Sequence, residues 1–312
     1  MTQMPTPSRP LRIGTRGSAL ALAQANETRD RLMAAHGLPA EAFRIVPIKT
    51  TGDRILDRPL KEIGGKGLFT REIEDALSGG EIDIAVHSMK DMPTIQPEGL
   101  VIDCLLPRED VRDAFVSPHA GRIADLPHGA VVGSSSLRRR AQLAHRRPDL
   151  VLVEFRGNVQ TRLQKLADGV AVATFLAMAG LSRLDMIHVA AGAIEPDEML
   201  PAVAQGAIGV ERRRDDDDCA ALLAAIHHRP TGIRVQAERA FLKRLDGSCQ
   251  TPIAGLAELD GDRLILRGEI LRPDGSEVVS ARREGMSADA AAMGDDLARE
   301  LLERAGPGFL QA

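Results

Sequence analysis

A cysteine stands among small and turn-forming residues near the end of the chain, in GSCQTPIAG at 247–255. This run separates a helical pattern from an alternating apolar pattern, so Cys249 is predicted on a loop. The other cysteines, Cys104 and Cys219, are distant in sequence, and the three form neither a metal-ligand pattern nor a disulfide framework. Cys104 lies in an apolar run and is expected in a core. Cys249 is therefore a candidate for a reactive or modified thiol, and no metal site is expected.

Hydroxyl and guanidinium side chains gather at two similar segments, RIGTRGSALALAQA from Arg12 and VVGSSSLRRRAQLA from Val131. Each has a strand pattern, a glycine, small hydroxyl residues and then a helical pattern with a glutamine. Helix N-termini bind anions, and the arginine fork matches carboxylates and phosphates. Either turn alone is more simply a helix cap with solvated arginines, but the pair favours an anion site. The residues concerned are Thr15, Arg16, Ser18, Ser134, Ser135, Ser136, Arg138 and Arg139.

Three more arginines follow the ends of predicted strands: Arg156 and Arg162 in FRGNVQTRL, and Arg183 in AGLSRL. Ligands of open α/β sheets bind at the carboxyl ends of the strands. In AVHSMKDMPT, Lys90 and Asp91 likewise come directly after a predicted strand. In isolation Asp91 is most simply a structural ion pair, whereas in an anion site it could stabilise a cation or move a proton.

The segment IGGKGLFTREIE places three glycines around Lys66. It lacks the closing Gly-Lys-Ser/Thr of a phosphate-binding P-loop. Together with TTGDRILDRPL it favours a lid over a cleft, with a plain flexible loop as the alternative.

Short apolar runs predict strands at 11–15, 43–48, 83–88, 100–106, 130–135, 150–155 and 170–176, and amphipathic patterns predict helices at 18–35, 67–78, 136–146 and 158–167. This alternation is typical of an α/β protein with largely parallel sheets. The repeated turns predict two similar lobes, with crossings near residues 107 and 200 that imply a hinge and a cleft. A late strand, AIGVE at 207–211, would return to the first lobe. Helices at 216–227, 231–246 and 287–305 and three strands around a PDG hairpin turn predict a small α+β third domain.

Composition limits the partners. The net charge of −4 and the aromatic content of 2%, with no Trp or Tyr, argue against a nucleic-acid partner. The N-terminus lacks the apolar core of a signal peptide, and no run approaches the roughly 20 apolar residues of a membrane span, so a cytoplasmic protein without membrane contact is expected.

Seven motifs in order resemble the porphobilinogen deaminase (hydroxymethylbilane synthase) family: TRGSALALAQA, GGKGLF, DIAVHSMKDMP, GSSSLRRRAQL, RGNVQTRL, AVAQGAIGVE and GSCQTPIAG. The resemblance runs from about Leu11 to the last helix. It implies two lobes like those of periplasmic binding proteins, at about 10–106 with 207–224 and at 112–200, and a cofactor-bearing domain at 229–312. It also implies a monomer.

The resemblance further implies that Cys249 carries a dipyrromethane cofactor through a thioether. Four porphobilinogen units are added with loss of ammonia, and water releases hydroxymethylbilane, which passes to uroporphyrinogen-III synthase. Asp91 matches the catalytic aspartate, and the acetate and propionate groups of the pyrroles explain the arginines. By the same resemblance Lys66 belongs to the lid, Arg16, Ser18, Arg156 and Arg183 bind the substrate or growing chain, and Ser88, Lys90, Ser136, Arg138, Arg139 and Arg162 hold the cofactor.

Three features depart from the family pattern, and none of them removes a residue assigned to chemistry. Glu62 stands where many family members have a second lid lysine, Ser248 replaces a common glycine before the cysteine, and the strand predicted at 170–176 lacks an acidic residue common in relatives. A bilobal anion-binding or sensor protein without catalysis would share the arginines and the cleft. A phosphate-handling transferase is disfavoured by the missing P-loop.

Overall fold

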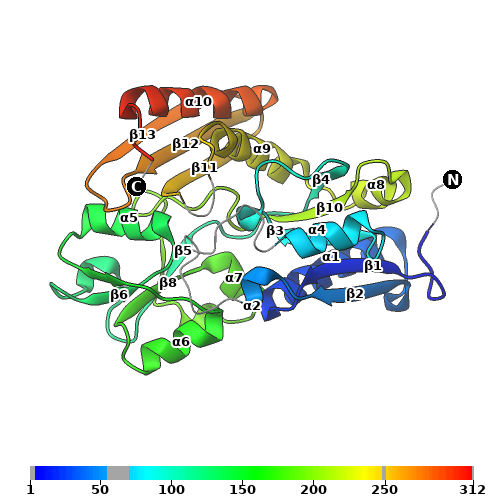
Figure 1. Cartoon of the computed structure of the whole chain (residues 1–312), viewed down its shortest axis with the longest axis horizontal. Helices are drawn as coiled ribbons and strands as arrows, with labels where there is room; N and C mark the ends of the chain where they lie inside the picture. The colour runs from blue at the N-terminus through cyan, green and yellow to red at the C-terminus, as the bar shows by residue number, and fades with distance from the viewer. Residues whose placement is uncertain (1–3, 55–69, 248–250, 311–312) are drawn as a thin grey trace. The chain divides into compact units, whose positions relative to one another are not determined.

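The computed structural model describes residues 4–54, 70–247 and 251–310. The chain divides into two compact units, and Figure 1 labels most of their helices and strands. The first unit comprises the described residues up to Arg108 together with Ala207–Gly232. The second comprises Glu109–Gly206 and Ile233–Ala312. The predicted boundaries of three domains, and the cleft and hinge between lobes, stay predictions.

A five-stranded sheet forms the centre of the first unit, with strand order β2-β1-β3-β10-β4. β1 is parallel to β2 and β3, whereas β10 is antiparallel to both of its neighbours. The insertion of β10 between β3 and β4 confirms the late strand predicted from AIGVE. The strands are β1 (Leu11–Arg16), β2 (Phe43–Ile48), β3 (Ile84–Ser88), β4 (Leu100–Leu105) and β10 (Ile208–Arg213).

Helices cover both faces of this sheet. On one face, α1 (Ala19–His36) and α8 (Asp217–Ala224) bury aliphatic side chains against β1, β3 and β10. On the other face, α4 (Arg71–Ser78) buries Ile73 and Leu77 against Ala85. A short helix, α2 (Thr51–Arg54), follows β2. Asp216 caps α8 by accepting a hydrogen bond from the Cys219 N–H.

The second unit repeats the arrangement with a sheet of order β7-β6-β8-β5-β9. Three parallel strands are again followed by an antiparallel fourth strand, so the prediction of two similar sheets is confirmed. α5 (Leu137–Arg146) packs on one face, and α6 (Val159–Ala167) and α7 (Met178–Arg183) pack on the other. The strands are β5 (Asp113–Val116), β6 (Val131–Gly133), β7 (Val151–Val153), β8 (Ala173–Ala177) and β9 (Gly192–Ile194).

β5 was not predicted from the sequence. Its residues lie next to the crossing between lobes that was predicted near residue 107. The strand has only four residues, and it begins with a charged one, Asp113, that is nonetheless fully buried. Hydrophobic periodicity cannot detect such a strand, because the pattern needs a longer run of apolar residues. β5 supplies the antiparallel partner of β8 and places Asp113 opposite Ala177.

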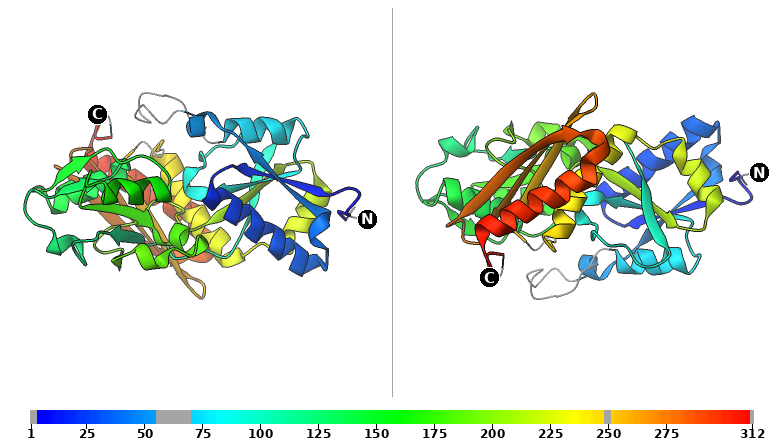
Figure 2. Two further views of the ribbon diagram at one scale, coloured as in Figure 1. Left: turned by 90° about the horizontal axis from the view of Figure 1, so that it is seen from below. Right: turned by 90° about the horizontal axis from the view of Figure 1, so that it is seen from above.

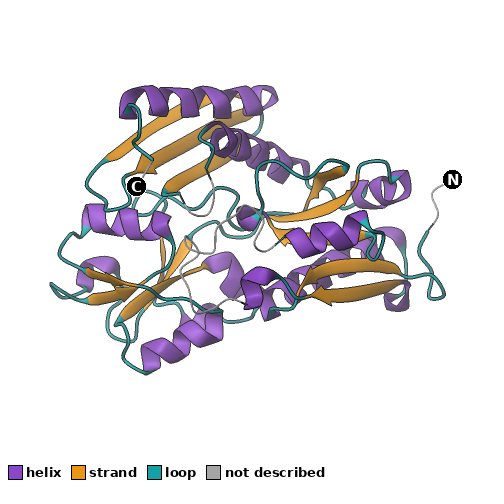
Figure 3. Ribbon diagram, viewed as in Figure 1, coloured by secondary structure: helices purple, strands orange, loops and turns teal. Residues whose placement is uncertain are grey.

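The C-terminal part is α+β, as predicted. α9 (Arg229–Arg244) leads to an antiparallel sheet of β11 (Ile253–Asp260), β12 (Arg263–Leu271) and β13 (Val278–Met286), and α10 (Ala290–Ala305) closes the chain. Figures 2 and 3 show α10 lying along this sheet. Phe241 of α9 packs so closely that a Cβ at Gly268 would lie 2.7 Å from its ring. The glycine therefore lets the helix approach the sheet.

Candidate functional site

A pocket opens in the first unit where β1 and β3 end and α1 begins. Arg16 comes from the end of β1 and Ser18 from the turn before α1, while Ser88 and Asp91 come from the end of β3 and the 3₁₀ turn after it. The structure thus brings together four of the residues predicted from three motifs. Lys90 lies in the same turn as Asp91. The complete lining is Arg16, Ser18, Leu20, Ala21, Gln24, Thr70, Val86, His87, Ser88, Asp91 and Met92.

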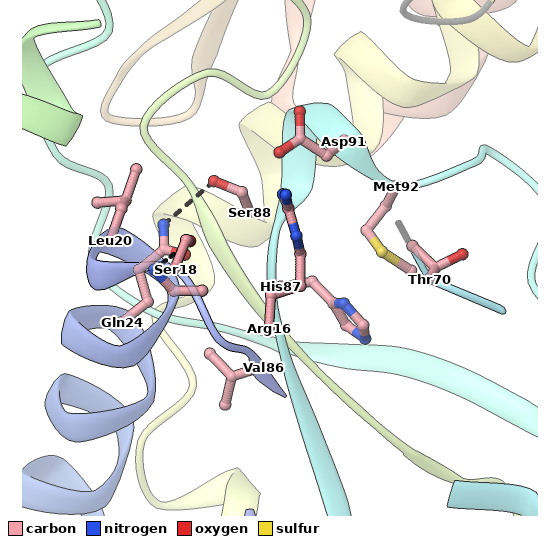
Figure 4. Close-up of a pocket in the computed structure, with 11 residues that line it drawn as sticks. Arg16, Ser18, Leu20, Gln24, Thr70, Val86, His87, Ser88, Asp91 and Met92 are labelled. Atoms are coloured by element: carbon pink, nitrogen blue, oxygen red, sulfur yellow. Dashed lines mark hydrogen bonds between the residues drawn. The ribbon is translucent and has the colours of Figure 1, made fainter. Parts of the chain in front are cut away.

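Figure 4 shows the Arg16 side chain pointing toward the Asp91 carboxylate. The pocket therefore offers a cation and an anion side by side. Ser18 accepts a hydrogen bond from the Ala21 N–H at 3.3 Å and so caps α1. The buried Gln24 donates from Nε2 to Ser88 Oγ at 3.1 Å. Because that oxygen accepts from Gln24, the Ser88 hydroxyl hydrogen is left to donate elsewhere.

His87 is buried in β3 and also lines the pocket. Its Nε2 lies 3.0 Å from Oε2 of Glu211, a fully buried carboxylate on β10. Glu74 of α4 is buried nearby. Burial first, and then the charge of Glu211, raise the pKa of Glu74 above its ordinary value.

In the second unit the arginine pair that follows β6 is buried rather than solvated. Arg138 and Arg139 are 5% and 6% exposed, and both contact the carboxylate of Asp113. Arg138 also donates to the Leu200 carbonyl at 2.7 Å, and Arg139 to the Phe175 carbonyl at 2.8 Å. The Asp113 carboxylate already occupies some of the N–H donors of both guanidinium groups. The binding of cofactor carboxylates by these arginines therefore stays a prediction.

Arg162 extends this pair into a cluster of positive charge. Its Nε donates to the Gly157 carbonyl at 2.9 Å. Burial, followed by the charges of Arg139 and Arg156, lowers the pKa of Arg162 to about 10. Guanidinium groups repel one another and lose hydration here, so the cluster favours the binding of an anion.

The hydroxyl residues of the second turn shape this region. Ser136 Oγ accepts from the Arg139 N–H at 3.4 Å and caps α5. Ser135 Oγ accepts from the Phe155 N–H at 2.9 Å. Gly133 is required for packing, because a Cβ there would lie 2.3 Å from the Phe155 ring. Arg183, predicted to join the cluster, donates to the Gly206 carbonyl at 3.1 Å.

Two predicted residues, Cys249 and Lys66, lie outside the described residues. Cys104 and Cys219 are buried, and burial raises the pKa of each thiol to about 12, so neither is a reactive thiolate at neutral pH. Within the described ranges there is no group of three or more His, Cys, Asp or Glu that could hold a metal ion. Nor is any described helix both long and apolar enough to cross a membrane.

Sequence reasoning missed several polar residues that the structure places at these sites: Gln24, Glu211, Asp113 and Gln205. Each stands alone in an apolar or mixed run, and only the fold shows what it contacts. A weak signal existed for the two glutamines, which both follow alanine in small-residue segments, AQA and AQG.

Comparison with known proteins assigns the family. Residues 11–221 match the model "Porphobilinogen deaminase, dipyromethane cofactor binding domain", and residues 233–303 match "Porphobilinogen deaminase, C-terminal domain". A porphobilinogen deaminase of Paracoccus denitrificans is 81% identical over 99% of both chains. The chloroplastic porphobilinogen deaminase of Pisum sativum is 56% identical over 97% of this chain and 84% of its own.

The solved structures that the chain is similar to include two ligand-binding proteins, both at low sequence identity. A methionine-binding protein is 12% identical and has a TM-score of 0.43 over 69% of this chain and 89% of its own. A Salmonella typhimurium periplasmic protein of high arginine specificity is 13% identical, with a TM-score of 0.41 over 70% of this chain and 91% of its own. The two family models and the curated relatives extend over nearly all of the sequence, and on that basis the chain belongs to the porphobilinogen deaminase family of transferases, which carry a dipyrromethane cofactor.

Proposed function

We propose that Asp91 is the catalytic residue of this porphobilinogen deaminase and that the pocket of the first unit is where the aminomethyl group of the substrate reacts. The observation that carries the proposal is the pocket itself, in which a carboxylate faces a guanidinium among hydroxyl groups. Arg16 and Ser18 would bind the substrate's carboxylates. Asp91 would contact the pyrrole N–H and the leaving amine.

The proton balance of the reaction suits a single carboxylate. In each cycle the C–N bond of porphobilinogen breaks and ammonia leaves, and a C–C bond forms at the free α-carbon of the accepting pyrrole, which then loses its proton. One proton is needed at the amine and one is released at the carbon. Asp91 could donate the first and accept the second, and its charge would stabilise the cationic substrate between the two events.

The residues present fit a cofactor with several carboxylates. The cluster of Arg139, Arg156 and Arg162 concentrates positive charge in a mildly acidic protein, and Arg138 Nε is buried with no hydrogen-bond partner among the described residues. We assign Arg156 and Arg183 to the substrate or growing chain. We assign Ser88, Lys90, Ser136, Arg138, Arg139 and Arg162 to the cofactor, which when bound supplies the pyrrole that accepts the first substrate.

The tether is assigned to Cys249 and a lid function to Lys66, both on the strength of the motifs alone. Porphobilinogen is the substrate of this enzyme family. We further propose that the protein acts as a monomer in the cytoplasm and that uroporphyrinogen-III synthase consumes its product. Light scattering of the purified protein tests the monomer, and fractionation of the source cells tests the location.

The experiment that tests the site compares Asp91→Asn with Arg122→Gln. Arg122 is exposed and pairs with Asp125, so its loss is a surface control in the other unit. We expect Asp91→Asn to keep the fold and the covalent cofactor but to lose turnover of porphobilinogen by roughly 10²-fold or more, the usual contribution of an acid–base residue. Near-normal turnover by a folded Asp91→Asn would show that another group does the proton transfer.

A further inference from the structure

Asp113 is the most completely paired buried carboxylate of the second unit's arginine region, and no step above uses it. It is fully buried at the start of β5. Arg138 Nη2 donates to its Oδ2 at 2.7 Å, and Arg139 donates to its Oδ1 from Nε at 3.2 Å and from Nη2 at 2.7 Å. Gln205 Nε2 adds a fourth hydrogen bond, to Oδ1, at 2.9 Å.

Two guanidinium groups meet the single carboxylate of Asp113, and the charge of Glu269 on β12 acts on Arg138 as well. The charge of Arg139 also acts on Arg162. Burial alone would raise the pKa of Asp113, but the two guanidinium charges and the hydrogen bonds from Arg139 and Gln205 lower it below its ordinary range. Burial lowers the pKa of Arg138.

The hydrogen bonds also determine which donors of Arg139 remain. A guanidinium has five N–H groups. Three are used, two by Asp113 and one by the Phe175 carbonyl. One N–H on Nη1 and one on Nη2 find no further partner among the described residues. Because the Nε edge is held by Asp113, the orientation of these two remaining donors is fixed.

We propose that Asp113 is a positioning residue for the anion site. It holds the Nε and Nη2 groups of Arg139. The two remaining N–H donors of this guanidinium, together with Arg162, then bind a carboxylate of the cofactor. Gln205 in turn fixes Asp113. This inference rests on the proposed function of the arginine cluster. It differs from a structural ion pair in predicting an effect on catalysis at unchanged folding.

The test compares a single variant, which lowers the buried charge by one, with a double variant, which restores the wild-type charge. Arg138→Met leaves the pair of Asp113 and Arg139 intact. Adding Asp113→Asn to Arg138→Met removes that pair and returns the net charge of the group to its wild-type value. Each holoenzyme is measured for its thermal transition, for covalent cofactor by denatured intact mass, and for kcat/KM with porphobilinogen. Arg162→Met is measured in parallel.

We expect the double variant to have a kcat/KM at least about tenfold below that of Arg138→Met, the factor that corresponds to one lost charge-assisted hydrogen bond, together with a lower fraction of loaded chains. Equal kcat/KM and equal loading for the two folded proteins would overturn the inference. If Arg162→Met nevertheless lowers kcat/KM, the arginine cluster still binds an anion, and only the positioning role of Asp113 is refuted. If Arg162→Met has no effect either, the anion site itself is wrong.

A second variant covers the case in which the double variant does not fold. Gln205→Met removes one donor from Asp113 without changing any charge. We expect its kcat/KM to fall about threefold, as for one neutral hydrogen bond, with the thermal transition still above the assay temperature. An unchanged kcat/KM in Gln205→Met would overturn the inference in that case.

Discussion

Replacing Arg162 by lysine should give this enzyme a new pH dependence. Burial and the charges of Arg139 and Arg156 lower the pKa of Arg162 from 12.5 to about 10, so the wild-type side chain stays charged at neutral pH. A lysine has an ordinary pKa of about 10.4. The same surroundings would lower the pKa of the ammonium in Arg162→Lys below that ordinary value, into the alkaline part of the assay range, since burial and like charges act on any cation.

The assay is kcat/KM with porphobilinogen from about pH 6.5 to about pH 9.5. Near pH 6.5 the Arg162→Lys ammonium is charged, and the variant should differ from wild type only by the loss of the planar fork. In the alkaline part of this range its kcat/KM should fall relative to wild type by up to roughly tenfold for each pH unit, as the charged fraction falls.

Arg147→Lys, at the C-terminal end of α5 in the same unit, provides the matched control. Arg147 pairs with Asp149 at 2.8 Å, and this hydrogen bond raises the pKa of Arg147, so a lysine there should stay charged throughout the range. The reasoning fails if the ratio of Arg162→Lys to wild-type kcat/KM is constant with pH, because the arginine cluster would then neither perturb the side chain nor act on the ligand.

Three further changes test other parts of the molecule. Cys249→Ser should abolish the covalent cofactor, and an intact mass that still includes two condensed porphobilinogen units would exclude Cys249 as the tether. Asp91→Ala should keep the circular dichroism spectrum of wild type but lose turnover by roughly 10²-fold or more, measured as release of ammonia. Burial and the charge of Glu211 raise the pKa of Glu74 in the folded protein above its ordinary value of 4.5. Its contribution to the free energy of unfolding is therefore complete below pH 4.5 and is lost as the pH rises through the pKa of the folded state. Glu74→Gln should therefore lose less unfolding free energy than wild type between about pH 5 and about pH 8 in urea titrations, and parallel curves would refute this.

Hydrophobic periodicity predicted most of the elements that position the site. The strand runs at 43–48 and 83–88 match β2 and β3 closely, and the helix predicted at 136–146 matches α5. β3 begins with a continuous apolar run and is buried over its first four residues, and α5 buries one face, so local pattern and tertiary burial agree there. The return of β10 was predictable because AIGVE follows a long crossing.

The electrostatics of the site were much less predictable, because they depend on contacts between residues far apart in sequence. Arg138 and Arg139 look like solvated arginines in the sequence, yet Asp113, some 25 positions earlier, makes their burial possible. Nothing in the sequence near His87 indicates its contact with Glu211, which lies 124 residues away. A charged residue in a short buried strand has no periodic signal, so its partner can be found only from the fold.

The two repeated turns show how similar sequences take different roles. Both need their glycine for packing, since a Cβ would lie 2.2 Å from Ile82 at Gly14 and 2.3 Å from Phe155 at Gly133. The glutamines of the following helices differ. Gln24 donates to Ser88 in the pocket, whereas Gln142 accepts from the Leu200 N–H at 2.8 Å and donates to the Leu200 carbonyl at 2.9 Å.

The second glutamine therefore fixes the backbone that also accepts a hydrogen bond from Arg138. One repeat presents its polar groups to the pocket, and the other uses them to hold buried arginines in place. The resemblance between the two turns thus reflects a shared way of joining a strand to a helix, and the chemistry of each depends on the residue that the next segment of chain supplies: Ser88 in the first unit and Asp113 in the second.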